Sequence, residues 1–242
     1  MTQHTRRREA IGAIIIMFAL ALAAVSVVFA DPSGATISNA VTETAVNRSP
    51  SSSNTSGGTI TTMLLTSIQQ NLRWKGYVGN VTGTLSLDDA ANFTIYDWDL
   101  TSFTGEVYAS RYSNLSWSSV SCAPGGLIQN ESSFYGMTQS ADDINSTFNW
   151  SVHKAFNVGT TTINANTCNS TVTNINDTRQ TPTASSPFQE ILLRDTSGYM
   201  VFLSDISDNV QGFDNQTYDF QLILPESISG SNTAYYFYVE LS

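Results

Sequence analysis

The sequence of 242 residues has little charge, and this shortage limits the partners it can bind. Charged residues make up 12% of the chain, against roughly 25% in soluble domains, and Ser, Thr and Asn take their place. Three of the 10 basic and one of the 20 acidic residues precede residue 31, which leaves 7 against 19 in the remainder. Nucleic-acid binding needs clustered Lys and Arg, so we expect no nucleic-acid partner.

Histidine and cysteine are scarce, which excludes the commonest catalytic and metal sites. A Ser-His-Asp triad would depend on His153, because His4 precedes the hydrophobic segment, and no Gly-x-Ser-x-Gly motif accompanies it. One histidine and two cysteines are too few for a usual zinc site. In an exported chain Cys122 and Cys168 predict a disulfide, and two separate buried thiols are the alternative.

One long apolar run lies near the N-terminus. Three arginines at residues 6–8 precede the uncharged segment Ala10–Ala30, whose 21 residues match the roughly 20 that span a bilayer. We predict a hydrophobic signal or anchor helix, with the arginines in the cytoplasm and the remaining chain outside. The segment also resembles the N-terminus of archaeal type IV pilins and archaellins. Three fates stay open: cleavage after Ala30, retention as an anchor, or packing into a filament core.

The chain beyond this segment divides into a linker and a domain. Residues 31–58 are rich in Ser, Thr, Asn and Ala, which is typical of a flexible stalk, and residues 59–242 form the predicted domain. Asn-x-Ser/Thr sequons recur along the exported part, and they predict a glycoprotein whose modified asparagines face solvent. The sequon asparagines are Asn47, Asn54, Asn80, Asn92, Asn114, Asn130, Asn145, Asn149, Asn169, Asn176 and Asn215.

Short apolar-polar alternations rich in β-branched and aromatic residues dominate the domain. We expect a mainly β fold, an antiparallel β-sandwich of Ig-like or jelly-roll-like type, with the N-terminal hydrophobic helix and one short helix. The short helix is expected at Ala141–Phe148 with Ser140 as its N-cap. The predicted strands are Thr59–Ile68, Arg73–Leu87, Phe93–Leu100, Gly105–Tyr112, Leu115–Ser121, Val158–Ile163, Phe188–Asp195, Tyr199–Ile206, Tyr218–Leu224 and Thr233–Leu241.

Several segments combine aromatic residues with glycine and acidic residues: Trp74–Gly83, Tyr96–Trp98, Gly105–Ala109, Tyr218–Glu226 and Tyr235–Leu241. In these segments the chain resembles a little-characterised family of archaeal exported surface proteins, and the resemblance covers most of residues 59–242. It implies a cell-surface location and a β body. It implies no reaction, because that family has no known catalytic residue.

Two kinds of binding site are predicted. Asp205, Asp208 and Asp214 supply oxygen ligands between two predicted strands and predict a calcium site, with a polar turn region as the alternative. We expect no cofactor, with calcium at this site as the alternative. The rings of Trp74, Tyr77 and Trp98 either pack within the sheet or form an exposed platform that stacks on sugars.

The leading interpretation is a non-enzymatic, glycosylated structural protein of the cell surface: a subunit of a surface layer, a pilin-like filament or another appendage. It is extracellular, either anchored to the membrane through the N-terminal helix or secreted. Its partners are copies of itself, other surface proteins or glycans. An adhesin module that binds glycans or cells is the alternative. A secreted carbohydrate-active enzyme using an Asp/Glu pair is the third, with pairs at Asp88-Asp89, Asp97 with Asp99, and Asp142-Asp143.

Overall fold

A computed structural model describes residues 31–44, 51–64, 71–91, 93–100, 104–138, 140–227 and 232–241. The hydrophobic helix predicted at residues 10–30 and the sequon asparagines Asn47 and Asn92 lie outside these ranges. In the part of the chain that the structure describes, the helices are too short or too polar to cross a bilayer.

The described chain is mainly β with antiparallel pairing, which confirms the fold class expected from the alternating sequence. Its helices are α2 (Gly125–Phe134) and α3 (Ile144–Thr147). Its strands are β1 (Ser33–Gly34), β2 (Trp74–Gly79), β3 (Thr84–Asp88), β4 (Thr94–Asp99), β5 (Gly105–Ser110), β6 (Ser121–Cys122), β7 (Phe156–Val158), β8 (Thr161–Ile163), β9 (Ser170–Val172), β10 (Gln189–Arg194), β11 (Met200–Asp205), β12 (Val210–Gln211), β13 (Thr217–Tyr218), β14 (Phe220–Pro225) and β15 (Tyr236–Leu241).

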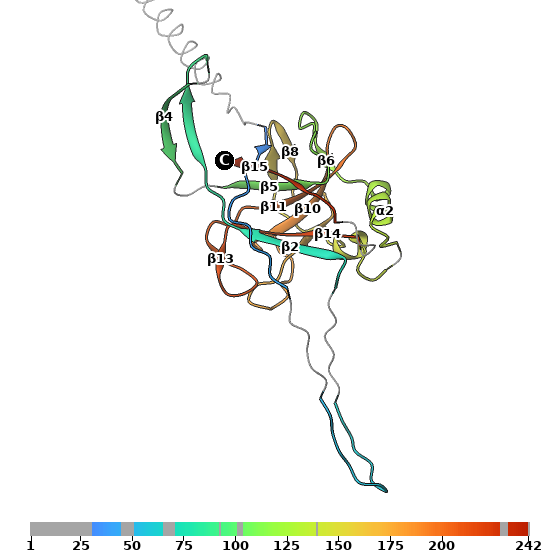
Figure 1. Ribbon diagram of the computed structural model, residues 1–242. Coiled ribbons are helices and arrows are strands. Elements are labelled where there is room, and N and C mark those ends of the chain that lie inside the picture. The colour runs from blue at the N-terminus through green and yellow to red at the C-terminus, as the bar shows by residue number, and fades with distance from the viewer. Residues whose placement is uncertain are drawn as a thin grey trace, which may run out of the picture.

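A seven-stranded sheet forms the centre of the body, in the order β1-β15-β5-β11-β10-β6, with β9 also paired to β10 (Figure 1). Every residue of β5 and β11 is buried, so other elements cover both faces of the sheet. Strand β11 places Met200 and Phe202 in one apolar cluster and Val201 and Leu203 in another. Both faces are therefore core, and the central strands lack the polar alternation of a sheet that faces water on one side.

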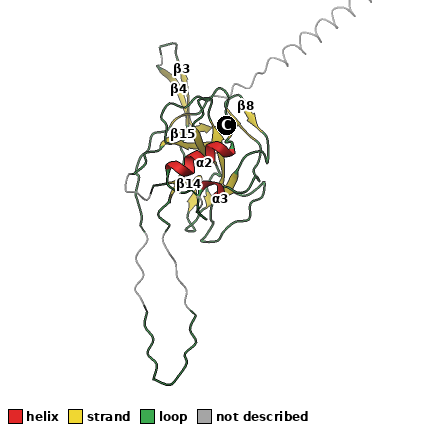
Figure 2. Ribbon diagram, turned by 90° about the vertical axis from the view of Figure 1, so that its right-hand side faces the viewer, coloured by secondary structure: helices red, strands yellow, loops and turns green. Residues whose placement is uncertain are grey.

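Different elements cover the two faces. On one face, the paired strands β2 and β14 contribute Leu222 and Leu224 to the cluster of Phe202, and Figure 2 shows α2 and α3 beside β14. On the other face, the β7–β8 hairpin and a loop that carries Leu115 and Trp117 pack over the sheet. This layering is consistent with the β-sandwich that the sequence predicts.

Helix α2 lies where the sequence predicts no helix, because its residues GGLIQNESSF include two glycines and other weak helix formers. Tertiary contacts hold it. Ile128 is buried in the core, and Arg111 donates to both carboxylate oxygens of Glu131 at 2.8 and 3.3 Å. The Arg111 guanidinium also lies 3.9 Å from the centroid of the Phe134 ring. Packing and a paired charge thus outweigh poor local propensity.

Two other predicted elements are shorter or absent. The predicted helix Ala141–Phe148 is reduced to α3, and its N-cap is Asp143, not Ser140, because the Asp143 carboxylate accepts from Ser146 N at 2.7 Å. The predicted strand Leu115–Ser121 is a loop up to its last residue, since its apolar side chains cover the sheet without joining a ladder.

Two predicted strands are each divided in two. The predicted strand Arg73–Leu87 becomes β2 and β3, because the chain leaves β14 after Gly79 and Val81 N donates to Asp219 Oδ2 at 2.7 Å. The predicted strand Val158–Ile163 becomes the β7–β8 hairpin, whose turn contains Gly159 at a φ of +54°.

The predicted disulfide between Cys122 and Cys168 is present. It joins β6 to the segment that precedes β9, and both strands pair with β10. The two cysteines are 46 residues apart, so the crosslink closes a long loop around α2, α3 and the β7–β8 hairpin.

Replacing both cysteines by alanine should lower the free energy of unfolding by about 4 kcal/mol, because the unfolded chain regains the freedom of a 46-residue loop. Urea denaturation measures the loss. Reduction of the unmodified chain is the control and should give a similar value. A double variant as stable as the oxidised chain would contradict this account.

Candidate functional site

The three aromatic residues predicted as a binding platform do not share a surface. Trp74 donates its indole N–H to Asp142 O at 2.9 Å and packs against the core cluster. Tyr77 packs edge-on against Phe237, with ring centroids 5.2 Å apart. Trp98, on β4, is 48% exposed. The first two rings therefore hold the sandwich together, and Trp98 belongs to a separate surface.

That surface is a two-stranded ribbon, β3 paired with β4, which projects from the body in Figure 1 and is called the aromatic ribbon below. The register pairs Leu87 with Tyr96 and Leu85 with Trp98, so these four positions lie on one face. The Tyr96 and Trp98 rings pack edge-on with centroids 4.5 Å apart, and Tyr96 is 56% exposed. The ribbon thus presents a continuous aromatic surface to solvent.

The opposite face of the aromatic ribbon is polar. It pairs Thr84 with Asp99 and Ser86 with Asp97. The aromatic ribbon is therefore amphipathic, as expected of a strand pair that packs against another element on one side only.

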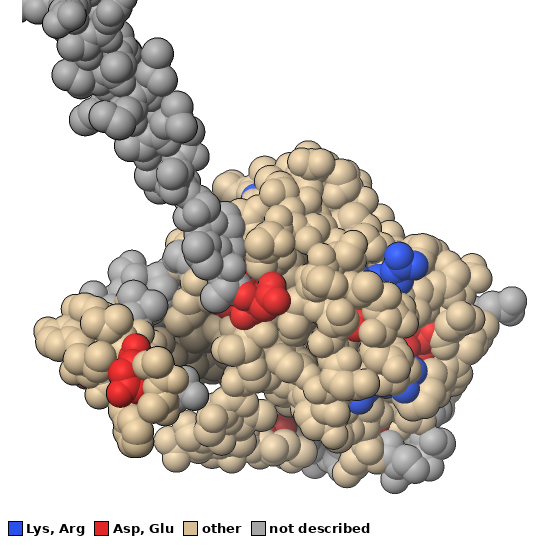
Figure 3. Space-filling view, turned by 90° about the horizontal axis from the view of Figure 1, so that it is seen from above, with Lys and Arg blue, Asp and Glu red and all other residues tan. Residues whose placement is uncertain are grey.

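Figure 3 shows how sparse charge is on the visible face of the molecule, where small acidic and basic groups are separated by neutral side chains.

A second unusual feature is a row of three buried carboxylates, called the carboxylate row below. The register pairs Glu106 of β5 with Asp205 of β11 on one side and with Glu240 of β15 on the other. Each is less than 9% exposed. Tyr108 donates its hydroxyl to Glu240 Oε2 at 2.9 Å, and Lys154 Nζ lies 2.5 Å from Asp205 Oδ1. The central carboxyl, Glu106, is flanked by an acid on each side.

Burial and like charge change the acidity of this row. Burial, then the charges of Asp205 and Glu240, raise the pKa of Glu106 to about 8. Burial also raises the pKa of Glu240, and Asp31 adds to this effect. Burial raises the pKa of Asp205 although Lys154 opposes it. The row therefore retains protons at pH values where exposed carboxylates are ionised.

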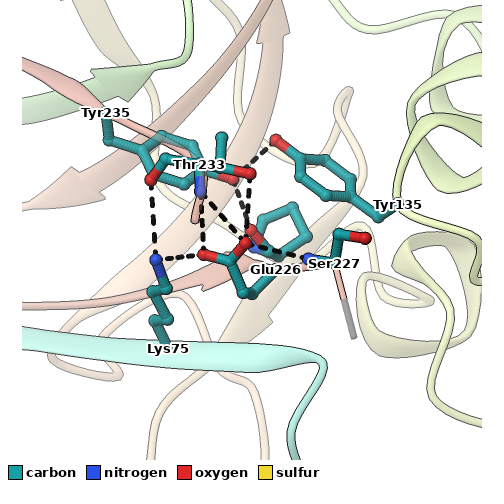
Figure 4. Close-up of polar contacts among 7 residues, drawn as sticks. Lys75, Tyr135, Glu226, Ser227, Thr233 and Tyr235 are labelled. Atoms are coloured by element: carbon teal, nitrogen blue, oxygen red, sulfur yellow. Dashed lines mark hydrogen bonds and ion pairs between the residues drawn. The ribbon is translucent and has the colours of Figure 1, made fainter. Parts of the chain in front are cut away.

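A polar network fixes the start of the C-terminal strand (Figure 4). Glu226 accepts from Thr233 N and Thr233 Oγ1, each at 3.1 Å, and forms an ion pair with Lys75 of β2. Tyr235 donates its hydroxyl to the Pro225 carbonyl at 2.6 Å, so the 2.7 Å contact with Tyr135 uses the Tyr135 proton. These contacts join β2, β14, β15 and the end of α2, and their role is structural.

His153 also has a structural role. Its Nδ1 lies 2.7 Å from Lys154 O, which can only accept, so Nδ1 carries the proton. Its Nε2 accepts from the backbone N–H groups of Thr167 and Cys168, each at 3.0 Å. Both ring nitrogens therefore shape the loop that carries the disulfide, and neither is oriented toward a nucleophile.

The acid pairs predicted for a glycosidase do not line the pocket beside Asp205 of the carboxylate row. This pocket, ≈ 310 Å³, is lined by Lys154, Ala184, Ser185, Ser186, Pro187, Gln189, Asp205, Ser207 and Val210. Among these described residues Asp205 is the one carboxylate, and it pairs with Lys154. Asp97 and Asp99 lie on the aromatic ribbon, and Asp143 caps α3. A glycosidase needs two facing carboxyl groups.

The predicted calcium ligands have separate partners. Asp205 pairs with Lys154, Asp208 accepts from Asn209 Nδ2 at 2.7 Å, and Asp214 accepts from the Tyr218 hydroxyl at 2.9 Å. Across the described ranges, no three His, Cys, Asp or Glu side chains are grouped as a metal site would need. The calcium site stays a prediction from sequence.

The described sequon asparagines lie mostly at the surface. Asn54, Asn80, Asn114, Asn130, Asn145, Asn149, Asn176 and Asn215 are exposed, and Asn169 is half-buried. Asn169 donates its amide to Phe148 O at 2.9 Å, so the nitrogen that a glycan would occupy already has a partner. Exposure at the other positions is compatible with a glycan coat.

Sequence reasoning named Trp98 as a binding aromatic but grouped it with Trp74 and Tyr77, which pack in the body. The period-two pattern Tyr96, Trp98 against Asp97, Asp99 was the available signal, since alternate strand residues share a face. The carboxylate row had no such signal, because its members lie on strands far apart in the chain and meet only through register.

Comparison with models of known protein families, with curated proteins and with solved structures finds no match to this chain.

Protonation of the carboxylate row should make the protein most stable in acid. The pKa of Glu106 is raised in the folded state, so its contribution is complete below about pH 4.5 and is lost as the pH rises toward about 8. At about 1.4 kcal/mol per pKa unit, a loss of roughly 3–5 kcal/mol is expected. Denaturation at several pH values measures it. Glu106→Gln should flatten the profile, and the exposed Asp97→Asn is the matched control that should not.

The two kinds of tryptophan should differ in their contribution to stability. Trp74→Ala removes a ring packed on the core and should cost about 2–4 kcal/mol of unfolding free energy. Trp98→Ala removes an exposed ring and should change it by about 0.5 kcal/mol or less. Denaturant titration of both variants decides this, and equal losses would mean that the aromatic ribbon is part of the core.

Proposed function

We propose that this chain is a non-enzymatic, glycosylated structural protein of a cell surface, a subunit of a surface layer, a pilin-like filament or another appendage. The aromatic ribbon carries the proposal. It exposes Leu87, Tyr96 and Trp98 on a projection with no covering element among the described residues. Exposed apolar patches on soluble proteins mark interaction sites. A subunit of an assembly contacts neighbouring subunits, so a neighbouring subunit is the partner we expect on this face.

The N-terminal features support a surface location. The segment Ala10–Ala30 serves as the membrane signal, anchor or filament helix, and the exposed sequons suit the outer side of a membrane. The resemblance to archaeal exported surface proteins agrees with this location. An Ig-like or jelly-roll-like connectivity of the sandwich belongs to the same proposal.

A glycan- or cell-binding adhesin is the second candidate, because one observation favours it. The Tyr96 and Trp98 rings are exposed and in edge-on contact on the aromatic ribbon, and an exposed aromatic face is a surface on which a sugar ring can stack. Binding of the chain to glycan arrays or intact cells, lost in the Tyr96→Ala and Trp98→Ala variants, would favour the adhesin.

Electron microscopy of native cell envelopes tests the leading proposal. Gold-labelled antibodies against the body should mark an ordered layer or filament on the outer surface. Protein extracted from those envelopes should run as large complexes and carry glycans at exposed sequons such as Asn114 and Asn130. A monomeric, unglycosylated protein with no ordered label would refute it.

A further inference from the structure

The aromatic ribbon is an incomplete sheet. Strand β3 pairs only with β4 among the described residues, so the outer edge of each strand leaves backbone groups without a ladder partner. Two-stranded ribbons are marginally stable in water, and a third strand against an apolar face is the usual remedy. The aromatic ribbon therefore has an open edge where another strand fits, and an added strand would extend its apolar face.

A strand-like segment without a partner exists in the same chain. Residues 51–64, called the arm below, are exposed throughout. Its second half, Thr59–Leu64, has the β-branched composition that predicts a strand, and yet it forms none. The described hydrogen bonds of the arm join only Thr55, Ser56 and Thr59 to one another. The arm thus has strand-forming residues that pair with no strand among the described residues.

The arm is apolar along one side. In an extended conformation Ile60, Thr62 and Leu64 point to the same side, and Ile60 and Leu64 are 99% and 93% exposed. Beside β4, this side would continue the surface formed by Tyr96 and Trp98. The two exposed apolar surfaces have matching geometry, since both repeat every second residue.

The arm and the aromatic ribbon lie at opposite ends of the molecule in Figure 1. A contact between them therefore joins two copies of the chain. Because the two surfaces differ, the contact is heterologous: each copy keeps one unused arm and one unused ribbon. Repetition of such a contact produces an open chain of subunits unless the rotation closes a ring.

Charge distinguishes this arrangement from pairing of two ribbons. The aromatic ribbon carries Asp88, Asp89, Asp97 and Asp99 and no Lys or Arg between residues 84 and 99. Two ribbons face to face would bring these acidic sets together, and like charges in contact are unfavourable. The arm has no charged residue, so it can approach the ribbon without that repulsion.

We propose that the arm of one copy adds as a third strand to the β4 edge of the aromatic ribbon in the next copy, with Ile60 and Leu64 beside Tyr96 and Trp98 on the same face. The occupant is a second copy of this chain, and its recognition is backbone pairing plus an apolar seam. This inference rests on the proposed structural function and specifies how its subunits connect.

Crosslinking of two single-cysteine variants tests the contact. The native cysteines are joined in a disulfide, so a cysteine introduced by Thr61→Cys or Asp97→Cys is the reactive thiol of the folded full chain. A short bis-maleimide added in detergent should link the two variants when they are mixed, and neither variant to itself. Links within the Asp97→Cys variant alone would indicate ribbon pairing, and absence of links in the mixture would refute the contact.

Complementation gives a sharper second test. Ile60→Asp damages only the arm and Trp98→Ala only the ribbon, and each should raise the concentration needed for assembly at least about tenfold. An equal mixture should form dimers and stop, because one intact arm meets one intact ribbon. Val41→Asp is the matched control, since Val41 is an 86% exposed β-branched residue outside both surfaces, and it should assemble normally.

The outcomes separate the two proposals. Normal assembly of Ile60→Asp and Trp98→Ala, with an assembling unmodified chain, would refute the arm-to-ribbon contact and leave the structural function standing. A full chain that stays monomeric in detergent and in native envelopes would refute both.

Discussion

Burial of the central strands on both faces is the constraint on which the rest of the structure depends. Once β5 and β11 are buried throughout, each face needs a cover, and the chain supplies β2, β14 and two helices for one and the β7–β8 hairpin with a loop for the other. Among these covering elements, α2 has poor local propensity for its structure. It is held by contacts with the sheet, which explains why a glycine-rich segment becomes α2.

The same burial makes an ionised side chain unfavourable in free energy. Buried acids are accommodated here in two ways, by pairing or by protonation. Glu226 receives several donors and a lysine, so it is ionised and satisfied. Glu106 and the fully buried Glu190 are not paired with a cation, and burial raises the pKa of each. The protonated state is then favoured, because moving a neutral carboxyl group out of water costs less free energy than moving a carboxylate. The chain has 10 basic and 20 acidic residues, so few cations are available to pair with buried acids.

The sequence predicted what local pattern controls. The apolar runs of β10, β11 and β14, the closing strand β15 and the disulfide are close to their predicted positions. Residues whose state depends on distant partners could not be predicted. Trp74 and Trp98 both lie in strands with a charged residue on each side, and only the β14 partner of β2 decides that one is packed and the other exposed. The carboxylate row likewise exists only after three strands align.

The way the chain enters the sheet has a mechanical consequence. Strand β1 holds to β15 by two residue pairs, and the next paired strand, β2, starts about 40 residues later. A force applied at residue 31 would separate β1 from β15 first, because only these two residue pairs join the two strands. Residues 35–44 and 51–64 form no helix or strand, so these described residues, with roughly 80–85 Å of contour, would extend before β2 took any load. Under such a force the chain before β2 would lengthen before the core was strained.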